Sequence, residues 1–200
     1  MTVILVVMVL VFGFLTGLAL VAPIGPVSLT LVGLGAEQGR RAALAGAGGV
    51  VMADVATVPL ALGGAGLLAG LDAGIVRDVE IVLGLLLVAV AITTVVRADQ
   101  AREAIASLRR PTWTLAALTA CNPLSLVAWS GLALALPSSI STPGALAAFG
   151  LGLVLASAVW HSGLAAASGT FANRLSTRMR TVLTRASGVL MLAIGAVLVV

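Results

Sequence analysis

The first long apolar stretch of the chain is interrupted by Pro23-Ile24-Gly25-Pro26-Val27-Ser28-Leu29. A related interruption, Asn122-Pro123-Leu124-Ser125-Leu126, lies inside a later apolar stretch, where Pro123 stands 97 positions after Pro26. Proline lacks a backbone N–H and clashes with the preceding helical turn, and inside a membrane the freed carbonyls need partners in protein or in a watered cavity. Paired broken helices in corresponding places are typical of transporters built from two repeats. The two breaks therefore predict a duplicated fold with a site at the breaks.

Composition places the chain in a membrane. Of its 200 residues, 60% are hydrophobic and 9% are charged, and the mean hydropathy is +1.21. A soluble domain of this length could carry that composition only by exposing large apolar patches. Six crossings of about 20 residues each would use most of the chain and leave no room for several independent domains. We therefore expect one integral membrane domain.

Six apolar runs have the length of membrane-spanning helices, which cross a core of about 30 Å with about 20 residues. They cover about 3–22 (continuing after the break to 36), 42–69, 79–96, 112–136, 144–169 and 182–200. The last run is the weakest, because about 15 residues follow Arg185 and the helix then needs a snorkelling Arg or a locally thinned bilayer. The expected fold class is all-α: six transmembrane helices as two inverted three-helix repeats, each with a proline-broken first helix.

Positive charge is concentrated in alternate loops. The formal net charge is +4 and there are eleven basic residues, all of them Arg. With six crossings, three loops share one side of the membrane, and they hold ten of these: Arg40, Arg41, Arg97, Arg102, Arg109, Arg110, Arg174, Arg178, Arg180 and Arg185. The positive-inside rule makes this side cytoplasmic and puts both termini outside. The basic balance is then a topology signal, and no nucleic-acid partner is expected.

A weak internal repeat supports this arrangement. Leu83-Gly84-Leu85 in the third run resembles Ser187-Gly188-Val189 in the sixth. A three-helix unit duplicated in tandem inserts its second copy upside down, so a pseudo-twofold axis should lie in the membrane plane, with the breaks facing each other across it. We expect residues 1–96 to form the first repeat, 97–111 a cytoplasmic linker and 112–200 the second repeat. The alternative is that the prolines only kink helices that pack together.

Asp54 and His161 are candidates for proton coupling. Asp54 is the one charged residue deep in an apolar run, where a carboxylate costs roughly 2.5–3.5 kcal/mol to insert, so such acids usually face a cavity. His161, the single histidine, lies 13 positions before Arg174, and Asp54 lies 13 after Arg41. At about 1.5 Å per residue, both are about 20 Å from the same edge, so they could pair. The alternatives are a structural hydrogen bond for Asp54 and a neutral histidine bonded to a neighbouring helix.

The residues at the two breaks are candidates for binding a substrate. Half-helices that begin at Pro26 and Pro123 would present free N–H groups and the positive end of the helix dipole, which suit a carboxylate such as that of an amino acid. Ser28, Ser125 and Asn122 could bond the freed carbonyls or line the cavity. The predicted substrate-binding residues are Pro23, Gly25, Pro26, Ser28, Asn122, Pro123 and Ser125.

Other functions find less support in the residues. The lone Cys121 excludes an internal disulfide or a multi-cysteine metal site, and Asp54 with His161 offers too few ligands for a dedicated metal, so neither a metal nor a cofactor is expected. An intramembrane enzyme acting on lipid or peptide is an alternative, although no Gly-x-Ser-x-Gly, His-Glu-x-x-His or second intramembrane acid occurs. A non-transporting accessory protein is a third reading. Small-residue helix faces such as Gly13-x-x-x-Gly17 are compatible with a homodimer.

The order of these motifs resembles the lysine exporter (LysE/RhtB) superfamily of small bacterial amino-acid exporters. The likeness runs nearly end to end, through Pro-x-Gly-Pro at 23–26, Gly39-Arg40-Arg41, Gly48 to Asp54, Asn122-Pro123, and Gly188 with Gly195. The resemblance implies a secondary transporter in the bacterial plasma membrane, with an inverted repeat, that exports an amino acid or related metabolite by alternating access, with proton antiport the usual proposal.

Two departures from the family pattern bear on the substrate. Where lysine-type members tend to carry Gln-Asn after Gly-Pro, this chain has Val27-Ser28, and Ala128 stands where some members have a polar or acidic residue shortly after Asn-Pro. A cavity with one carboxylate suits a dibasic substrate poorly. We therefore expect a neutral or small amino acid, or a related metabolite.

Overall fold

In the computed structural model, the regular structure is entirely helical over the described residues, which are 3–22, 25–68, 72–98, 100–137, 140–174 and 176–199. The helices are α1 (Val3–Val21), α2 (Pro26–Glu37), α3 (Arg40–Leu68), α4 (Ala73–Val96), α5 (Ala101–Ala106), α6 (Pro111–Ala120), α7 (Pro123–Leu134), α8 (Pro143–Arg174) and α9 (Thr177–Val199). The predicted all-α class is confirmed for this part of the chain.

Both predicted breaks separate helices. The first apolar run becomes α1 and α2, and the fourth becomes α6 and α7, whereas the other four runs are the continuous helices α3, α4, α8 and α9. Pro26 and Pro123 each occupy the first position of the helix after the break, where the missing N–H has no intrahelical acceptor to lose. Pro59, by contrast, lies inside α3 without ending it.

Among the described residues, four helices are long and apolar enough to cross a membrane. The candidate spans are Val3–Val21, Arg40–Gly64, Arg77–Val96 and Pro143–Ser168. The apolar part of α9, Thr184–Val199, is shorter, as its sequence predicts. Helices α6 and α7 have 10 and 12 residues, so each falls short of the roughly 20 residues that a crossing needs. Four crossings are therefore supported by length and composition. The two further predicted crossings would need α6 and α7 to cross together and the short apolar part of α9 to cross by itself.

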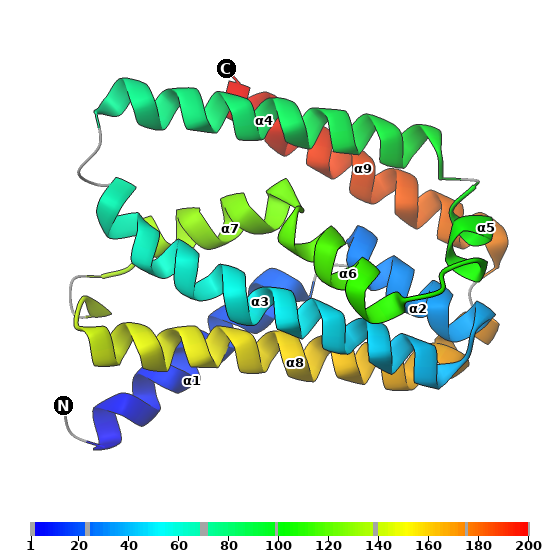
Figure 1. The fold of residues 1–200 in the computed structure, drawn as a ribbon, viewed down its shortest axis with the longest axis horizontal. Helices are drawn as coiled ribbons and strands as arrows, with labels where there is room; N and C mark the ends of the chain where they lie inside the picture. The colour runs from blue at the N-terminus through cyan, green and yellow to red at the C-terminus, as the bar shows by residue number, and fades with distance from the viewer. Residues whose placement is uncertain are drawn as a thin grey trace.

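The helices form layers, with α4 and α9 lying along one side of the bundle and α3, α8 and α1 along the other (Figure 1). Helices α2, α6 and α7 lie between them. The main buried cluster joins α1, α3, α7 and α8 around Phe149 and Trp129, and a second joins α2, α3, α6 and α8 around Leu34 and Leu115. A separate small cluster, Leu87, Ala91 and Met191, holds α4 against α9.

Glycines set the closest helix crossings. A Cβ on Gly13 would collide with the backbone of Phe149 in α8, and one on Gly49 would collide with the backbone of Thr112 in α6. Such close approach of backbones is how helices without a large hydrophobic driving force associate in a membrane. These crossings fix α1 on α8 and α6 on α3, and thereby position the two breaks.

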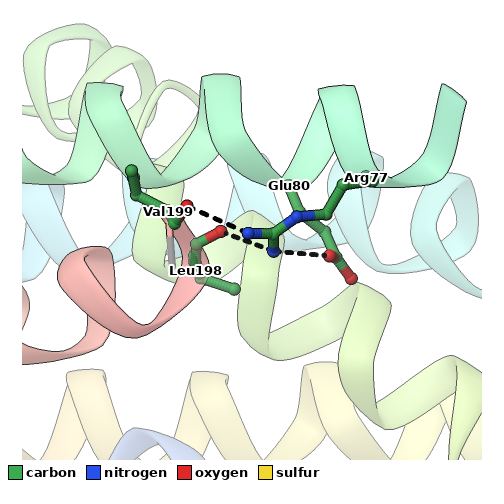
Figure 2. Close-up of polar contacts among 4 residues, drawn as sticks. All are labelled: Arg77, Glu80, Leu198 and Val199. Carbon is green, nitrogen blue, oxygen red and sulfur yellow. Dashed lines mark hydrogen bonds and ion pairs between the residues drawn. The ribbon is translucent and has the colours of Figure 1, made fainter. Parts of the chain in front are cut away.

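The start of α4 holds the end of α9. The Arg77 guanidinium donates hydrogen bonds to the carbonyl oxygens of Leu198 (3.1 Å) and Val199 (2.9 Å) and lies 3.5 Å from the Glu80 carboxylate (Figure 2). The last carbonyls of a helix have no intrahelical donor, so Arg77 caps α9 with a charged group. The pairing with Glu80 is half exposed and contributes little by itself.

The segment between the two predicted repeats is fastened to α2. The side-chain amide of Gln38 donates to the carbonyl oxygens of Ile105 (2.7 Å) and Leu108 (3.0 Å) at the end of α5. Ile105 packs against Gly33 of α2. The chain then turns from α2 into α3 at Gly39, whose φ of 85° lies in the left-handed region that glycine adopts without strain. The linker is thus held against the bundle rather than extended away from it.

Candidate functional site

The two helix breaks border one cavity of about 110 Å³. Its lining comes from α1, α2, α3, α6, α7 and α8: Leu20, Val21, Gly25, Pro26, Val27, Ser28, Val50, Asp54, Thr119, Asn122, Ser125, Ala128, Trp129 and His161. The volume lies below the roughly 300–1,000 Å³ typical of pockets for drug-sized ligands. A cavity of this size suits a small metabolite.

Most of the residues predicted to bind substrate line this cavity. Gly25, Pro26, Ser28, Asn122 and Ser125 all contribute to its wall. Of the other two, Pro123 is the first residue of α7, next to Asn122, and Pro23 lies outside the described residues. The structure therefore brings the two breaks to a common space, as a functional reading of the breaks requires.

The start of α2 is open at the cavity. Gly25 is the N-cap residue, with extended backbone (φ −101°, ψ −176°), and it provides no side-chain cap. The N–H groups in the first turn of a helix have no intrahelical acceptor, and the helix dipole adds a partial positive charge there. An anionic group in the cavity would therefore be stabilised at this end of α2.

Asp54 and His161 also line the cavity, and Ser157 links them. Ser157 Oγ donates a hydrogen bond of 2.5 Å to Asp54 Oδ2. His161 Nδ1 lies 3.0 Å from Ser157 Oγ and 3.0 Å from the backbone oxygen of Ser157. The exposed fractions of Asp54, Ser157 and His161 are 3%, 0% and 6%. The acid and the imidazole, predicted to lie at similar depth, thus belong to one buried network with a serine between them.

Sequence reasoning missed Ser157. It precedes His161 by one helical turn, so both side chains lie on the same face of α8. That spacing was available in the sequence, but a serine in an apolar helix more often bonds to its own backbone. Only the crossing of α8 over α3 shows that this hydroxyl reaches Asp54.

Two further wall residues carry polar atoms without a partner. Thr119 Oγ1 and Trp129 Nε1 are buried and have no hydrogen-bond partner among the described residues, and both side chains are 4% exposed. An unsatisfied buried donor costs about 1–3 kcal/mol, so native proteins usually keep one only where something else bonds to it. The sequence gave no signal that either polar atom would be left unpaired.

The cavity combines an acid–serine–imidazole network, an uncapped helix start and unpaired donors. Among the described residues, no group of three or more His, Cys, Asp or Glu side chains is placed to hold a metal ion. A family model for LysE type translocators matches residues 18–200. The chain belongs to the LysE type translocator family. No curated protein and no solved structure matches the chain.

Family membership confirms the resemblance seen in the sequence motifs. Members of this family are transporters, and the apolar helices place this LysE-type protein in a membrane. Its substrate is accordingly a small molecule.

Proposed function

We propose that this LysE-type protein exports a neutral or small amino acid, or a related small metabolite, from the bacterial cytoplasm by proton antiport with alternating access. The observation that carries the proposal is the shared cavity at the two helix breaks, because it joins a proton-titratable network to unpaired donors that can hold a passenger. Asp54, His161, Thr119 and Trp129 all line this space, which has the size of a small metabolite.

The cargo's carboxylate would be held by donors from both halves. The uncapped start of α2 offers backbone N–H groups and a partial positive charge, while Thr119 and Trp129 bring the unpaired hydroxyl and indole N–H. Asp54 is the one carboxylate in the wall and can accept from the cargo's ammonium group. The site thus offers one carboxylate for an ammonium group and one set of donors for a carboxylate. This combination favours a substrate with a single carboxylate and a single amine over a dibasic substrate.

Proton coupling would run through Ser157. When the Asp54 carboxylate is ionised, it accepts the Ser157 hydroxyl proton, and His161 Nδ1–H donates toward Ser157. When Asp54 is protonated, it can donate to Ser157 Oγ, which is then free to donate to an unprotonated Nδ1. Reversing the hydrogen bonds of one serine therefore transmits the protonation state of Asp54 to His161 without moving a helix.

The contacts between α4 and α9 support the inverted repeat. A Cβ on Gly84 would meet the carbonyl oxygen of Gly195 and the side chains of Leu198 and Val199, and a Cβ on Gly188 would meet the carbonyl oxygen of Ala91 and the side chains of Thr94 and Val95. Adding 104 to the numbers of Gly84, Ala91, Thr94 and Val95 gives those of Gly188, Gly195, Leu198 and Val199. The two sets of contacts are thus exchanged by a twofold operation, as inverted repeats require.

The same exchange relates the packing of α1 on α8 to that of α6 on α3, so 1–96 and 112–200 would be the repeats and 97–111 the linker. The ends of the described chain lie toward one end of the bundle, and the Arg-bearing loops after α2, α4 and α8 lie at the other (Figure 1). With those loops cytoplasmic, both termini would be outside, and six crossings result if α1–α2 and α6–α7 each cross once.

The test begins with a metabolite screen for what leaves cells faster when the protein is overproduced. The purified protein is then reconstituted in liposomes, and flux of that metabolite is driven by an imposed pH gradient. We expect Asp54→Asn to abolish gradient-driven flux and the exposed Asp78→Asn to retain it, because Asp78 lies on α4 and does not line the cavity. Unchanged flux in Asp54→Asn would remove the coupling role, and the absence of any exported metabolite would overturn the exporter proposal.

A further inference from the structure

A long groove separates the α4–α9 pair from the rest of the bundle. Two hollows of about 550 and 480 Å³ lie along this boundary. They share the wall residues Pro26, Thr30, Thr94 and Leu118, so the two hollows adjoin, and we call them together the α4–α9 groove. Each hollow has the size of an ordinary ligand pocket, and the groove is distinct from the smaller cavity that contains Asp54.

The surface of the groove is mainly apolar, although several of its residues are threonines. Thr30 Oγ1 donates to the carbonyl oxygen of Pro26 (2.8 Å), and Thr93 and Thr94 both donate to the carbonyl oxygen of Val90 (2.8 Å each). These three hydroxyls are therefore satisfied by their own helices. The inner half of the groove adds the apolar side chains of Val90, Ala117, Leu118 and Met191, which suit a hydrocarbon chain rather than a polar metabolite.

One end of the groove is charged. Arg97 and Gln100 line the outer hollow and are exposed, at the end of the bundle where the Arg-bearing loops lie. Val90 precedes Arg97 by seven residues on the same chain segment, so the apolar part lies about 10 Å deeper at about 1.5 Å per residue. A guanidinium at the polar edge with an apolar channel beneath it is complementary to a phosphate that carries an acyl chain.

We propose that the α4–α9 groove binds one anionic phospholipid, with its phosphate at Arg97 and an acyl chain running past Leu118 toward Cys121 and Met191. The groove opens to the bilayer, because Leu118 is 52% exposed and Cys121 is exposed. Pro26, Val27 and Asn122 line both this groove and the central cavity. These three residues therefore separate the lipid chain in the groove from the central cavity that contains Asp54.

Lipid retention tests the site independently of transport. The protein is reconstituted in vesicles of phosphatidylcholine with a minor share of phosphatidylglycerol, extracted gently, and its bound lipid is identified by native mass spectrometry. We expect wild type to retain phosphatidylglycerol selectively and Arg97→Gln to retain about fivefold less, the usual weight of one Arg at a lipid surface. Arg109→Gln is the matched control, because Arg109 is exposed in the same segment but does not line the groove.

A second variant blocks the acyl chain and leaves Arg97 in place. Ala117→Phe should fill the inner hollow and reduce retention of both lipids. Wild-type retention of phosphatidylglycerol in either Arg97→Gln or Ala117→Phe would overturn the proposal, and both variants are first checked for a monodisperse, helical protein.

The single cysteine reports directly on what occupies the groove. With an acyl chain in place, Cys121 should resist a charged, water-soluble thiol reagent in vesicles and become reactive once the protein is stripped of lipid. Rapid labelling in vesicles would overturn the proposal by showing a watered route for cargo. Oxidative cross-linking of Cys121 between two copies would overturn it by showing a partner subunit there.

Discussion

Replacing Ser157 with alanine removes the hydroxyl that joins Asp54 to His161. Asp54 Oδ2 loses its 2.5 Å hydrogen bond and His161 Nδ1 loses one of its two acceptors, at a position with no solvent access. Leaving a buried polar group unsatisfied costs about 1–3 kcal/mol, or a fall of several degrees in the midpoint of thermal unfolding. The exposed Ser162→Ala on the same helix is the control and should leave stability unchanged.

The effect on coupling separates a relay from a merely structural hydrogen bond. In liposomes that report internal pH and cargo flux together, Ser157→Ala should lower the number of protons moved per cargo molecule, and Ser157→Thr, which keeps the hydroxyl, should restore it. Asp54→Asn and Ser157→Ala should also be non-additive in a double-mutant cycle, since the two groups share one interaction. A folded Ser157→Ala protein with the wild-type proton-to-cargo ratio would refute the relay.

Three further substitutions test packing and binding. Gly49→Ala should lower the thermal midpoint, because its Cβ would strike the backbone of α6, whereas the neighbouring Gly48→Ala, with open space around it, should be neutral or stabilising. Arg77→Gln should lower the midpoint more than Glu80→Gln does, because it leaves two helix-end carbonyls uncapped while the half-exposed ion pair contributes little; equal effects would contradict the capping role. Trp129→Phe should raise the apparent KM for cargo about tenfold while leaving stability unchanged or slightly higher, because it removes a donor that is unpaired in the folded protein; an unchanged KM would remove Trp129 from cargo binding.

The helix breaks could be predicted because proline chemistry is local. Pro26 and Pro123 each begin a helix, as the motifs around them indicate. Pro59 shows the limit of that reasoning, since it has the same missing N–H and yet lies within a continuous helix. The preceding residues differ, because Gly25 precedes Pro26 and Asn122 precedes Pro123, two residue types that favour the N-cap position, whereas Val58 precedes Pro59.

The site could be predicted only in part, for a different physical reason. The similar depth of Asp54 and His161 follows from counting residues along helices, but Ser157 joins them through the way α8 crosses α3. The unpaired donors of Thr119 and Trp129 depend on side-chain orientation, which no periodicity encodes. The hydrogen bond from the Gln38 side chain to the carbonyl oxygen of Ile105 likewise joins residues 67 positions apart. Nothing in the sequence around either residue indicates this contact.

The backbone contact between Gly84 and Gly195 has a mechanical consequence. A Cβ on either glycine would collide with the carbonyl oxygen of the other, so the backbones of α4 and α9 are in close contact there and should resist sliding past each other. The hydrogen bonds from Arg77 to the last carbonyls of α9 join the two helices at one end as well. We therefore expect the pair to move as one rigid unit, with the hinge of any rearrangement that opens the bundle lying outside it. The distance between spectroscopic labels on α4 and α9 should therefore stay constant through a transport cycle, while the distance between labels on α9 and α8 should change.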